Sequence, residues 1–358
     1  MRLLSRTFTK NAPDIWLHQR YRLLTAALLL FALFTPLLAA GLGAVSIPPA
    51  QVLAALTGHG SGIDSQIIVS LRLPRILLAF IAGAGLSLAG AVLQLVTRNP
   101  LADPYLFGIS SGASLGAVAV MTLLGGSFTG MGLGYLAGSL PYISLPVGAF
   151  AGAALSVMLV FALSTGAGNQ VERMLLAGVA TSFMFGAFSS LLLYFSEPRA
   201  AAAVLFWTLG SFTRASWDGL LLPALVVGLS LLILLGLKRQ LLALQGGDET
   251  AHSLGIKVAR FRLGILLLCS LITAVLVASC GGIGFVGLMV PHTMRLLLPG
   301  RQPLLLTALA GGIFMIWVDV LARCLLDNQE LPVGVITAAL GSVFFLLVLR
   351  RRRRMDYA

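Results

Sequence analysis

The sequence predicts an all-α membrane protein that crosses the bilayer ten times. Of its 358 residues, 58% are hydrophobic and only 10% are charged, whereas about 25% of a typical soluble domain is charged. Ten mostly apolar stretches also approach the roughly 20 residues that a helix needs to span a membrane. Soluble and disordered proteins are excluded, because both need far more polar surface.

The predicted spans are residues 23–43, 74–96, 106–124, 144–164, 174–195, 219–237, 263–279, 282–297, 304–321 and 333–349. The first span follows a basic stretch, as a signal peptide would, but nine further spans favour a retained helix. We therefore divide the chain into a basic segment (1–22), a transmembrane domain (23–349) and a basic tail (350–358).

The distribution of Lys and Arg orients the spans. An even number of spans places both termini on one side, and both termini are basic. With that side cytoplasmic, 19 of the 24 Lys and Arg residues lie inside, as the positive-inside rule predicts. The net charge of +12 therefore indicates membrane anchoring rather than nucleic-acid binding.

Small residues predict close helix packing in the third and fourth spans. Gly108, Gly112 and Gly116 recur at every fourth residue, and Gly148 and Gly152 repeat that spacing. Such a stripe lets helix backbones approach one another in lipid. We expect a tightly packed bundle.

Several motifs resemble catalytic sites without their required context. Residues 108–112 match the Gly-x-Ser-x-Gly nucleophile pattern, but they open a membrane span and lack a nearby His base. Residues 282–287 match the dinucleotide fingerprint, but no βαβ unit surrounds them. We interpret His292 as a packing or capping residue, and Cys269 and Cys280 as small buried residues. The sequence contains no P-loop, so the chain has no ATPase motif of this type.

Three arginines on the predicted outer side are unexpected there. Arg72 and Arg75 flank Pro74, and proline favours the first turn of a helix. Cations at a helix N-terminus oppose the helix dipole, and the outer side disfavours them. An extracytoplasmic anionic partner would explain both arginines, with snorkelling to lipid phosphates as the alternative. Arg323 is the third, although Asp319 lies four residues earlier and could pair with it locally.

The longest inner loop, residues 238–262, contains a predicted short helix. Asp248 could cap its start, Glu249 suits the first turn, and Gly255 suits the left-handed position after its end. Such a helix is typical of a docking element for a cytosolic protein. A purely structural connector is the alternative.

Five separate motifs resemble the FecCD/BtuC-like permeases of type II ABC importers, which take up ferric siderophores, haem or cobalamin. They are Leu71–Arg75 with residues 89–104, residues 173–178, the 247–255 loop, Gly282–Arg295 and Glu330–Gly334. They occur in the family's order and cover nearly all of the chain beyond residue 22. The resemblance implies a BtuC-like bundle in the bacterial inner (plasma) membrane.

The resemblance also implies partners and site residues. It implies a second permease subunit (identical or paralogous), two cytosolic ATPases that hold ATP and Mg, an extracytoplasmic substrate-binding protein and a metal-chelate substrate. This chain itself would be no enzyme and would bind no cofactor, metal or nucleic acid. Binding-protein docking falls on Arg72, Arg75 and Arg323. ATPase coupling falls on Gly247, Asp248, Glu249, Thr250, Ala251, Leu254 and Gly255, and the cytoplasmic gate on Asn99, Leu101, Val171 and Glu172. A helix beside the outer mouth is expected at residues 207–212, with Trp207, Gly210 and Phe212.

The expected mechanism is alternating access driven by the ATPases, with a ferric siderophore as the favoured cargo and haem or cobalamin as alternatives. A proton-coupled secondary transporter is a more distant alternative. Such carriers place acids deep in the membrane, and here only Asp319 is near a span interior. An intramembrane serine protease would need a contact between Ser110 and a histidine that the spacing does not provide.

Overall fold

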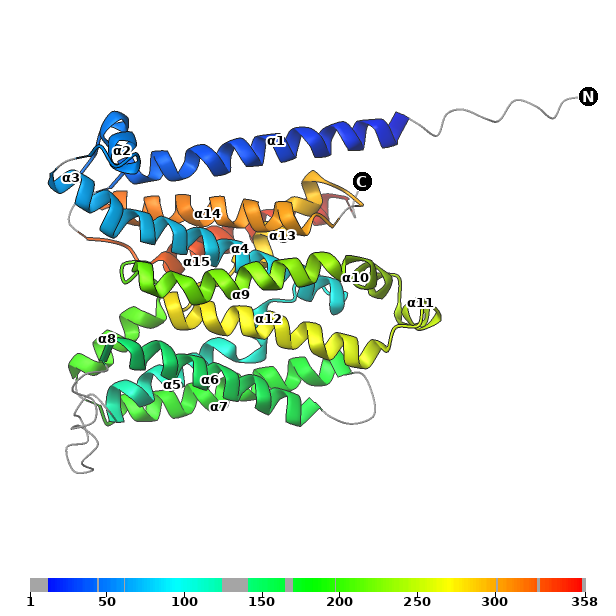
Figure 1. Ribbon diagram of the computed structural model, residues 1–358. Helices are drawn as coiled ribbons and strands as arrows, with labels where there is room; N and C mark the ends of the chain where they lie inside the picture. Colours follow the sequence, from blue (N-terminus) through cyan, green and yellow to red (C-terminus); the bar gives the residue numbers. More distant parts are fainter. Residues whose placement is uncertain are drawn as a thin grey trace, which may run out of the picture.

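The computed structural model describes residues 12–43, 45–60, 62–123, 141–164, 170–196, 198–300, 302–326 and 329–355. Across these ranges the chain forms helices and no strand, and the long helices lie side by side in one bundle (Figure 1). The predicted all-α class is confirmed. The first eleven residues of the N-terminal segment and the last three of the tail lie outside this description.

A helix overlaps each of the ten predicted spans. These helices are α1 (Ala12–Gly41), α4 (Leu73–Val96), α5 (Ile109–Leu123), α6 (Pro141–Ser164), α7 (Gln170–Tyr194), α9 (Trp217–Gly236), α12 (Val258–Cys280), α13 (Val286–Leu297), α14 (Leu304–Cys324) and α15 (Val333–Met355). Seven helices in the described part of the chain are long and apolar enough to cross a membrane, and α5 and α15 contain shorter apolar stretches. Helix α13 has 12 residues. The protein is therefore a multi-pass membrane protein.

Short helices mark the two ends of the bundle. At one end, here called the α2 end, lie α2 (Pro49–Leu56), α3 (Ile63–Gln66) and α8 (Pro198–Thr208). At the other, the α11 end, lie α10 (Lys238–Gln245) and α11 (Asp248–Ser253). Helix α1 begins and α15 ends at the α11 end (Figure 1).

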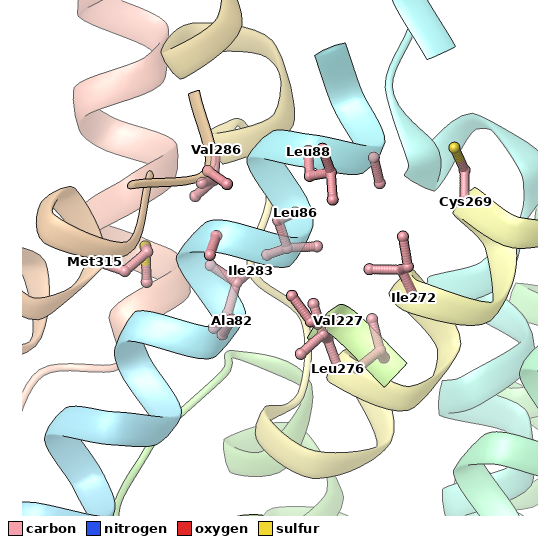
Figure 2. Packing of buried hydrophobic residues seen from close by; sticks show 14 of the residues in the cluster. Ala82, Leu86, Leu88, Val227, Cys269, Ile272, Leu276, Ile283, Val286 and Met315 are labelled. Carbon is pink, nitrogen blue, oxygen red and sulfur yellow. The ribbon is translucent and has the colours of Figure 1, made fainter. Parts of the chain in front are cut away.

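Helix α4 forms the centre of the bundle. Every residue from Ala82 to Val96 is buried, because α4 is surrounded by α9, α12, α13 and α14. Figure 2 shows Leu86 of α4 beside Leu276 of α12 and Val286 of α13. Small residues are interspersed with Leu and Val along α4. They allow the neighbouring helices to approach α4 closely and enclose it in protein rather than lipid.

Glycines allow the closest backbone approaches. A Cβ atom added to Gly116 would stand 1.9 Å from the carbonyl oxygen of Gly148, and one on Gly112 would stand 2.4 Å from that of Gly152. The predicted glycine stripe is thus confirmed as a packing surface, and the stripes of α5 and α6 face each other. Gly90 on α4 approaches α13 in the same way.

Helix α4 begins at Leu73, one residue before the predicted start of the second span, but this start is not a free helix N-terminus. A continuous helical segment begins at Ile63 and passes through a π-helical turn, Ile67–Arg72, directly into α4. There the Leu73 N–H donates to the carbonyl of Ile68, five residues earlier. The wider turn accommodates a proline that an ordinary helix interior would exclude. Arg72 and Arg75 therefore lie within a helix, so the argument from an exposed N-terminal dipole does not apply to them.

Candidate functional site

The three predicted docking arginines gather at the α2 end of the bundle, and each has partners within the chain. Arg72 is only 8% exposed. Its guanidinium donates to the carbonyls of Ala40 and Val45, both at 2.6 Å. These carbonyls lie at and beyond the C-terminal end of α1, where helix carbonyls lack partners of their own. Arg72 therefore ties α1 to the start of α4.

Asp319 joins the other two arginines. It is fully buried on α14, 2.8 Å from Nε of Arg75 and 3.2 Å from Nε of Arg323. The local Asp319–Arg323 pair that the sequence suggested is confirmed. The sequence did not predict the pair with Arg75, because 244 residues separate the two partners.

Glu330 completes the cluster from the connection before α15. Its carboxylate is 2.9 Å from Nη1 of Arg75 and its side chain is 44% exposed, against 11% for Arg75. Glu330 therefore occupies the outward side of Arg75. A carboxylate that approached from outside would meet Arg75 already paired.

At the α11 end, the predicted short helix is present, but its start differs from the prediction. Gly247, with φ +119°, takes the N-cap position and no side chain caps the helix, so the capping role assigned to Asp248 is wrong. The end follows the prediction, because Gly255 is left-handed (φ +78°). The N–H groups of Gly255 and Ile256 donate to the carbonyls of His252 and Ala251, as in a Schellman motif.

Asp248 instead holds α11 against the bundle. Its Oδ1 accepts from Arg98, in the loop after α4, and from Nη2 of Arg262 on α12 at 2.9 Å. Arg98 is one of two residues other than glycine with positive φ in the described chain (+52°), a conformation uncommon for such residues. The ion pairs connect the predicted coupling helix to the residue that directly precedes Asn99.

The predicted gate residues of the α4–α5 connection form a compact turn beside α11. Oδ1 of Asn99 accepts from the Leu101 N–H at 2.9 Å, and Leu101 is 58% exposed. Asp103 then accepts from the Tyr105 N–H at 2.8 Å and caps a short 3₁₀ helix, Pro104–Phe107. Burial raises the pKa of Asp103 to about 6.

The second predicted gate segment lies at the start of α7. Glu172 is exposed in the first turn of that helix. Val171 belongs to the same turn, but its side chain lies outside the description.

The predicted outer-mouth helix lies earlier in the chain than expected. Helix α8 ends at Thr208, so Trp207 occupies its last turn, and Gly210 and Phe212 fall in the connection that follows. Gly210 has φ +77°, which ends the helix. Its carbonyl accepts from the Val333 N–H at 3.0 Å, so this connection is tied to the start of α15. Phe212 is completely buried.

Three further residues have structural roles. His292 packs edge-on against Phe344 with 5.7 Å between ring centroids, which confirms the packing interpretation. Cys269 and Cys280 are buried, as predicted. Among the residues that the structure describes, no group of three or more His, Cys, Asp or Glu side chains could hold a metal ion.

Known proteins resemble the chain over nearly its whole length. Residues 28–351 match the FecCD transport family. The cobalamin import permease BtuC of Halobacterium salinarum is 40% identical over 80% of this chain and 74% of its own length. The haemin permease HmuU of Yersinia pestis is 36% identical over 93% of this chain and 97% of its own length.

A solved structure shares the arrangement of helices. It shows an inward-facing metal-chelate type ABC transporter, with 31% identity and a TM-score of 0.77 over 92% of this chain and 99% of that one. The chain belongs to the FecCD transport family, the permease subunits of type II ABC importers for iron chelates, haem or cobalamin.

Proposed function

We propose that this chain forms the translocation path of an ATP-driven importer for a ferric siderophore. One observation carries the proposal: two charged sites lie at opposite ends of one bundle. The arginine cluster is at the α2 end, and the ion-paired α11 is at the other. An importer subunit needs both, because it must receive cargo on one face and the action of a motor on the other.

In this proposal all ten long helices cross the bacterial inner membrane and both termini are cytoplasmic. The start of α1 and the end of α15 at the α11 end support that orientation. Residues 247–255 then seat on a cytosolic ATPase, which holds ATP and Mg, while this chain binds no cofactor. A second permease subunit, identical or paralogous, completes the path.

The docking site for a substrate-binding protein is assigned to the α2 end. Arg75 is the docking arginine in contact with an exposed carboxylate, that of Glu330. Arg72 and Arg323 are more deeply buried and hold α1 against α4 and α14. A carboxylate of the binding protein would exchange with Glu330 on Arg75, and charge pairs of this kind favour a specific partner.

The proposed cargo class is drawn from the names of related permeases. Relatives are named as permeases for cobalamin, haemin and iron(3+)-hydroxamate, the last being FhuG of Bacillus subtilis at 34% identity over 87% of this chain. A ferric siderophore is favoured, with haem and cobalamin as the alternatives.

The test is uptake by the complete complex reconstituted in vesicles, with each of the three cargoes offered separately. We expect ATP-dependent uptake of the ferric siderophore that disappears without the ATPase. Uptake that persists without the ATPase and follows a proton gradient would instead support a secondary transporter. Uptake of haem or cobalamin alone would retain the importer and change its cargo.

A further inference from the structure

A cavity of about 320 Å³ lies at the α11 end of the bundle, between the end of α6 and the starts of α7 and α12. Its volume is close to the lower limit of small-molecule sites. The residues that line it are Phe161, Ala162, Ser164, Met174, Arg262, Leu263 and Leu266. All of them except Ser164 and Arg262 are apolar, so an occupant would have to be largely hydrocarbon.

The cavity lies where two exposed apolar stripes meet, each with the spacing of one helix face. The stripes consist of Ala151, Leu155, Met158 and Ala162 on α6 and of Leu263, Leu267 and Leu271 on α12. The two helices pack against each other, and Ala162 and Leu263 belong both to the stripes and to the cavity lining. Exposed apolar faces of membrane helices contact acyl chains, which are as apolar as leucine. The cavity is therefore open to lipid.

Two cations precede the stripe on α12. Lys257 is the N-cap of that helix, and Lys257, Arg260 and Leu263 are spaced three residues apart, so they share one face. Both cations are exposed, and neither side chain has an ion pair in the described part of the chain. Arg262, in the cavity wall, is by contrast paired with Asp248. Positive charge thus remains available beside the apolar cavity.

The cations lie at the depth of lipid headgroups. Helix α12 is an apolar span of 23 residues, and about 20 residues cross the hydrocarbon core, so Lys257 and Arg260 fall at its edge. Arg173, which is also exposed, directly precedes Met174 of the cavity wall, and Glu172 beside it is the nearest acid along α7. Basic sites between membrane helices on the cytoplasmic side are suited to anionic headgroups.

We propose that an anionic phospholipid of the cytoplasmic leaflet binds at this place. Its phosphate lies at Lys257 and Arg260, and one acyl chain enters the cavity between α6, α7 and α12. A zwitterionic lipid offers the same chains without the net charge that the two cations attract. An acidic surface of the cytosolic ATPase would also attract these cations, but it has no hydrocarbon chain for the cavity.

The bound lipid would act next to the proposed coupling segment. Helix α12 begins three residues after Gly255, where that segment ends. A phosphate at Lys257 would hold this end at the membrane surface. The inference rests on the proposed orientation, in which the α11 end is cytoplasmic, but its test needs no transport. Lipid binding can therefore fail while uptake succeeds, and the reverse.

The measurement is a lipid titration of the complete complex in detergent, followed by native mass spectrometry. The probes are phosphatidylglycerol and phosphatidylcholine with the same acyl chains. We expect the wild type to bind phosphatidylglycerol at least tenfold more tightly than phosphatidylcholine. An excess of inorganic phosphate should not displace it, because the acyl chain contributes to binding.

A charge variant tests the headgroup site. Lys257→Gln combined with Arg260→Gln should weaken binding of phosphatidylglycerol about thirtyfold, which corresponds to about 1 kcal/mol for each cation. The matched control is Lys238→Gln combined with Arg239→Gln. It removes two exposed cations at the start of α10, outside the cavity lining, and should bind phosphatidylglycerol like the wild type.

A volume variant tests the acyl-chain site. Ala162→Phe would extend a ring into the cavity and should weaken binding of phosphatidylglycerol about tenfold, the factor for about two methylene groups displaced from an apolar site. Ala151→Phe is the control, because Ala151 lies on the same exposed face of α6 but outside the lining. If the charge variant fails to assemble, Ala162→Phe and its control decide the question.

Several results would overturn the inference and leave the importer function intact. They are equal affinities for the two lipids, wild-type binding in both site variants, equal losses in the site variants and their controls, and displacement of the lipid by inorganic phosphate. Loss of the ATPase from the charge variant, with normal lipid binding, would also overturn it and would assign Lys257 and Arg260 to the motor instead.

Discussion

At the scale of single residues, the charged groups of the α2 end act first as structural ties. Asp319 pairs with Arg75 and Arg323, and the backbone carbonyls of Ala40 and Val45 accept from Arg72. Buried ion pairs add little net stability, but removing one partner leaves the other charge uncompensated. Reversing the charge of Arg72 would place a carboxylate against two carbonyls, so this substitution would report on folding as well as docking.

We predict that Asp319→Asn destabilises the protein strongly. The amide keeps the size of the side chain but removes the only fully buried carboxylate that pairs with Arg75 and Arg323 among the described residues. The expected loss is about 3 kcal/mol, measured by thermal unfolding of the purified protein in detergent. Asp218→Asn, which changes an exposed acid in the first turn of α9, should leave the transition unchanged. Equal unfolding temperatures for Asp319→Asn and Asp218→Asn would contradict a stabilising role of the Asp319 ion pairs.

At the scale of elements, glycine contacts and short connections determine how the helices meet. The facing stripes of α5 and α6 bring backbone against backbone, and α11 is held by Arg98 and Arg262 through one carboxylate oxygen. The glycine contacts leave no room for a side chain between the backbones of α5 and α6. The side chains of the Arg98–Asp248 pair, by contrast, are about half-exposed. Movement between elements is therefore easier at α11 than between α5 and α6.

We expect Gly116→Val to disrupt the α5–α6 contact. The new Cβ would overlap the Gly148 carbonyl, and forcing extra atoms into a packed interface costs about 1–3 kcal/mol or more. The measurements are the yield of folded protein and its unfolding temperature. Gly264→Val on α12 is the control, since an added Cβ there meets open space. A normal unfolding temperature for Gly116→Val would show that the helices can separate at little cost.

Within the proposed function, Asp248→Asn should weaken the connection between α11 and the Asn99 turn. Loss of both ion pairs leaves α11 attached mainly by its backbone and by the buried Ala251. The pair with Arg98 is exposed and contributes about 1 kcal/mol or less, whereas the Arg262 side chain is largely buried. We expect the ATPase still to bind and hydrolyse ATP. Cargo moved per ATP should fall about twofold to fivefold.

The same assay distinguishes the loss of the Asp248 ion pairs from a nonspecific loss of transport. Arg98→Gln removes only one of the two ion pairs of Asp248, so it should lower the ratio of cargo to ATP in the same direction but less than Asp248→Asn. The double variant should be no worse than Asp248→Asn alone, as for residues that act as a pair. Additive losses, or an unchanged ratio of cargo to ATP, would show that Arg98 and Asp248 do not act together.

At the scale of the whole molecule, the bundle separates its two charged sites to opposite ends. Arg75 lies near the start of α4 and Asp248 begins α11, and Figure 1 places these elements at opposite ends. The seven long apolar helices require a membrane around the bundle. The two sites therefore face different compartments in the proposed orientation.

Cysteine labelling in intact cells tests this orientation. The native Cys324 is exposed at the end of α14, near the arginine cluster. We expect a membrane-impermeant maleimide to label Cys324 from outside, and Cys324→Ser to abolish that signal. In the Cys324→Ser background, Lys257→Cys, just before α12, should react only after the membrane is opened. Labelling of both positions from one side would refute the topology.

The sequence determined the all-α class, the location of a helix in each predicted span, the glycine contacts and the family. All of these follow from apolar runs, small-residue spacing and motifs, which are local properties of the chain. The tertiary structure decided which charges meet. The partners in the Arg75–Asp319, Arg75–Glu330 and Arg98–Asp248 pairs are separated by 150 or more residues, and helix packing alone brings them together. Likewise, the hydroxyl-bearing residues Ser110, Ser189 and Thr208 line one cavity although they belong to three helices, α5, α7 and α8. Their spacing along the chain carries no sign that they share one wall.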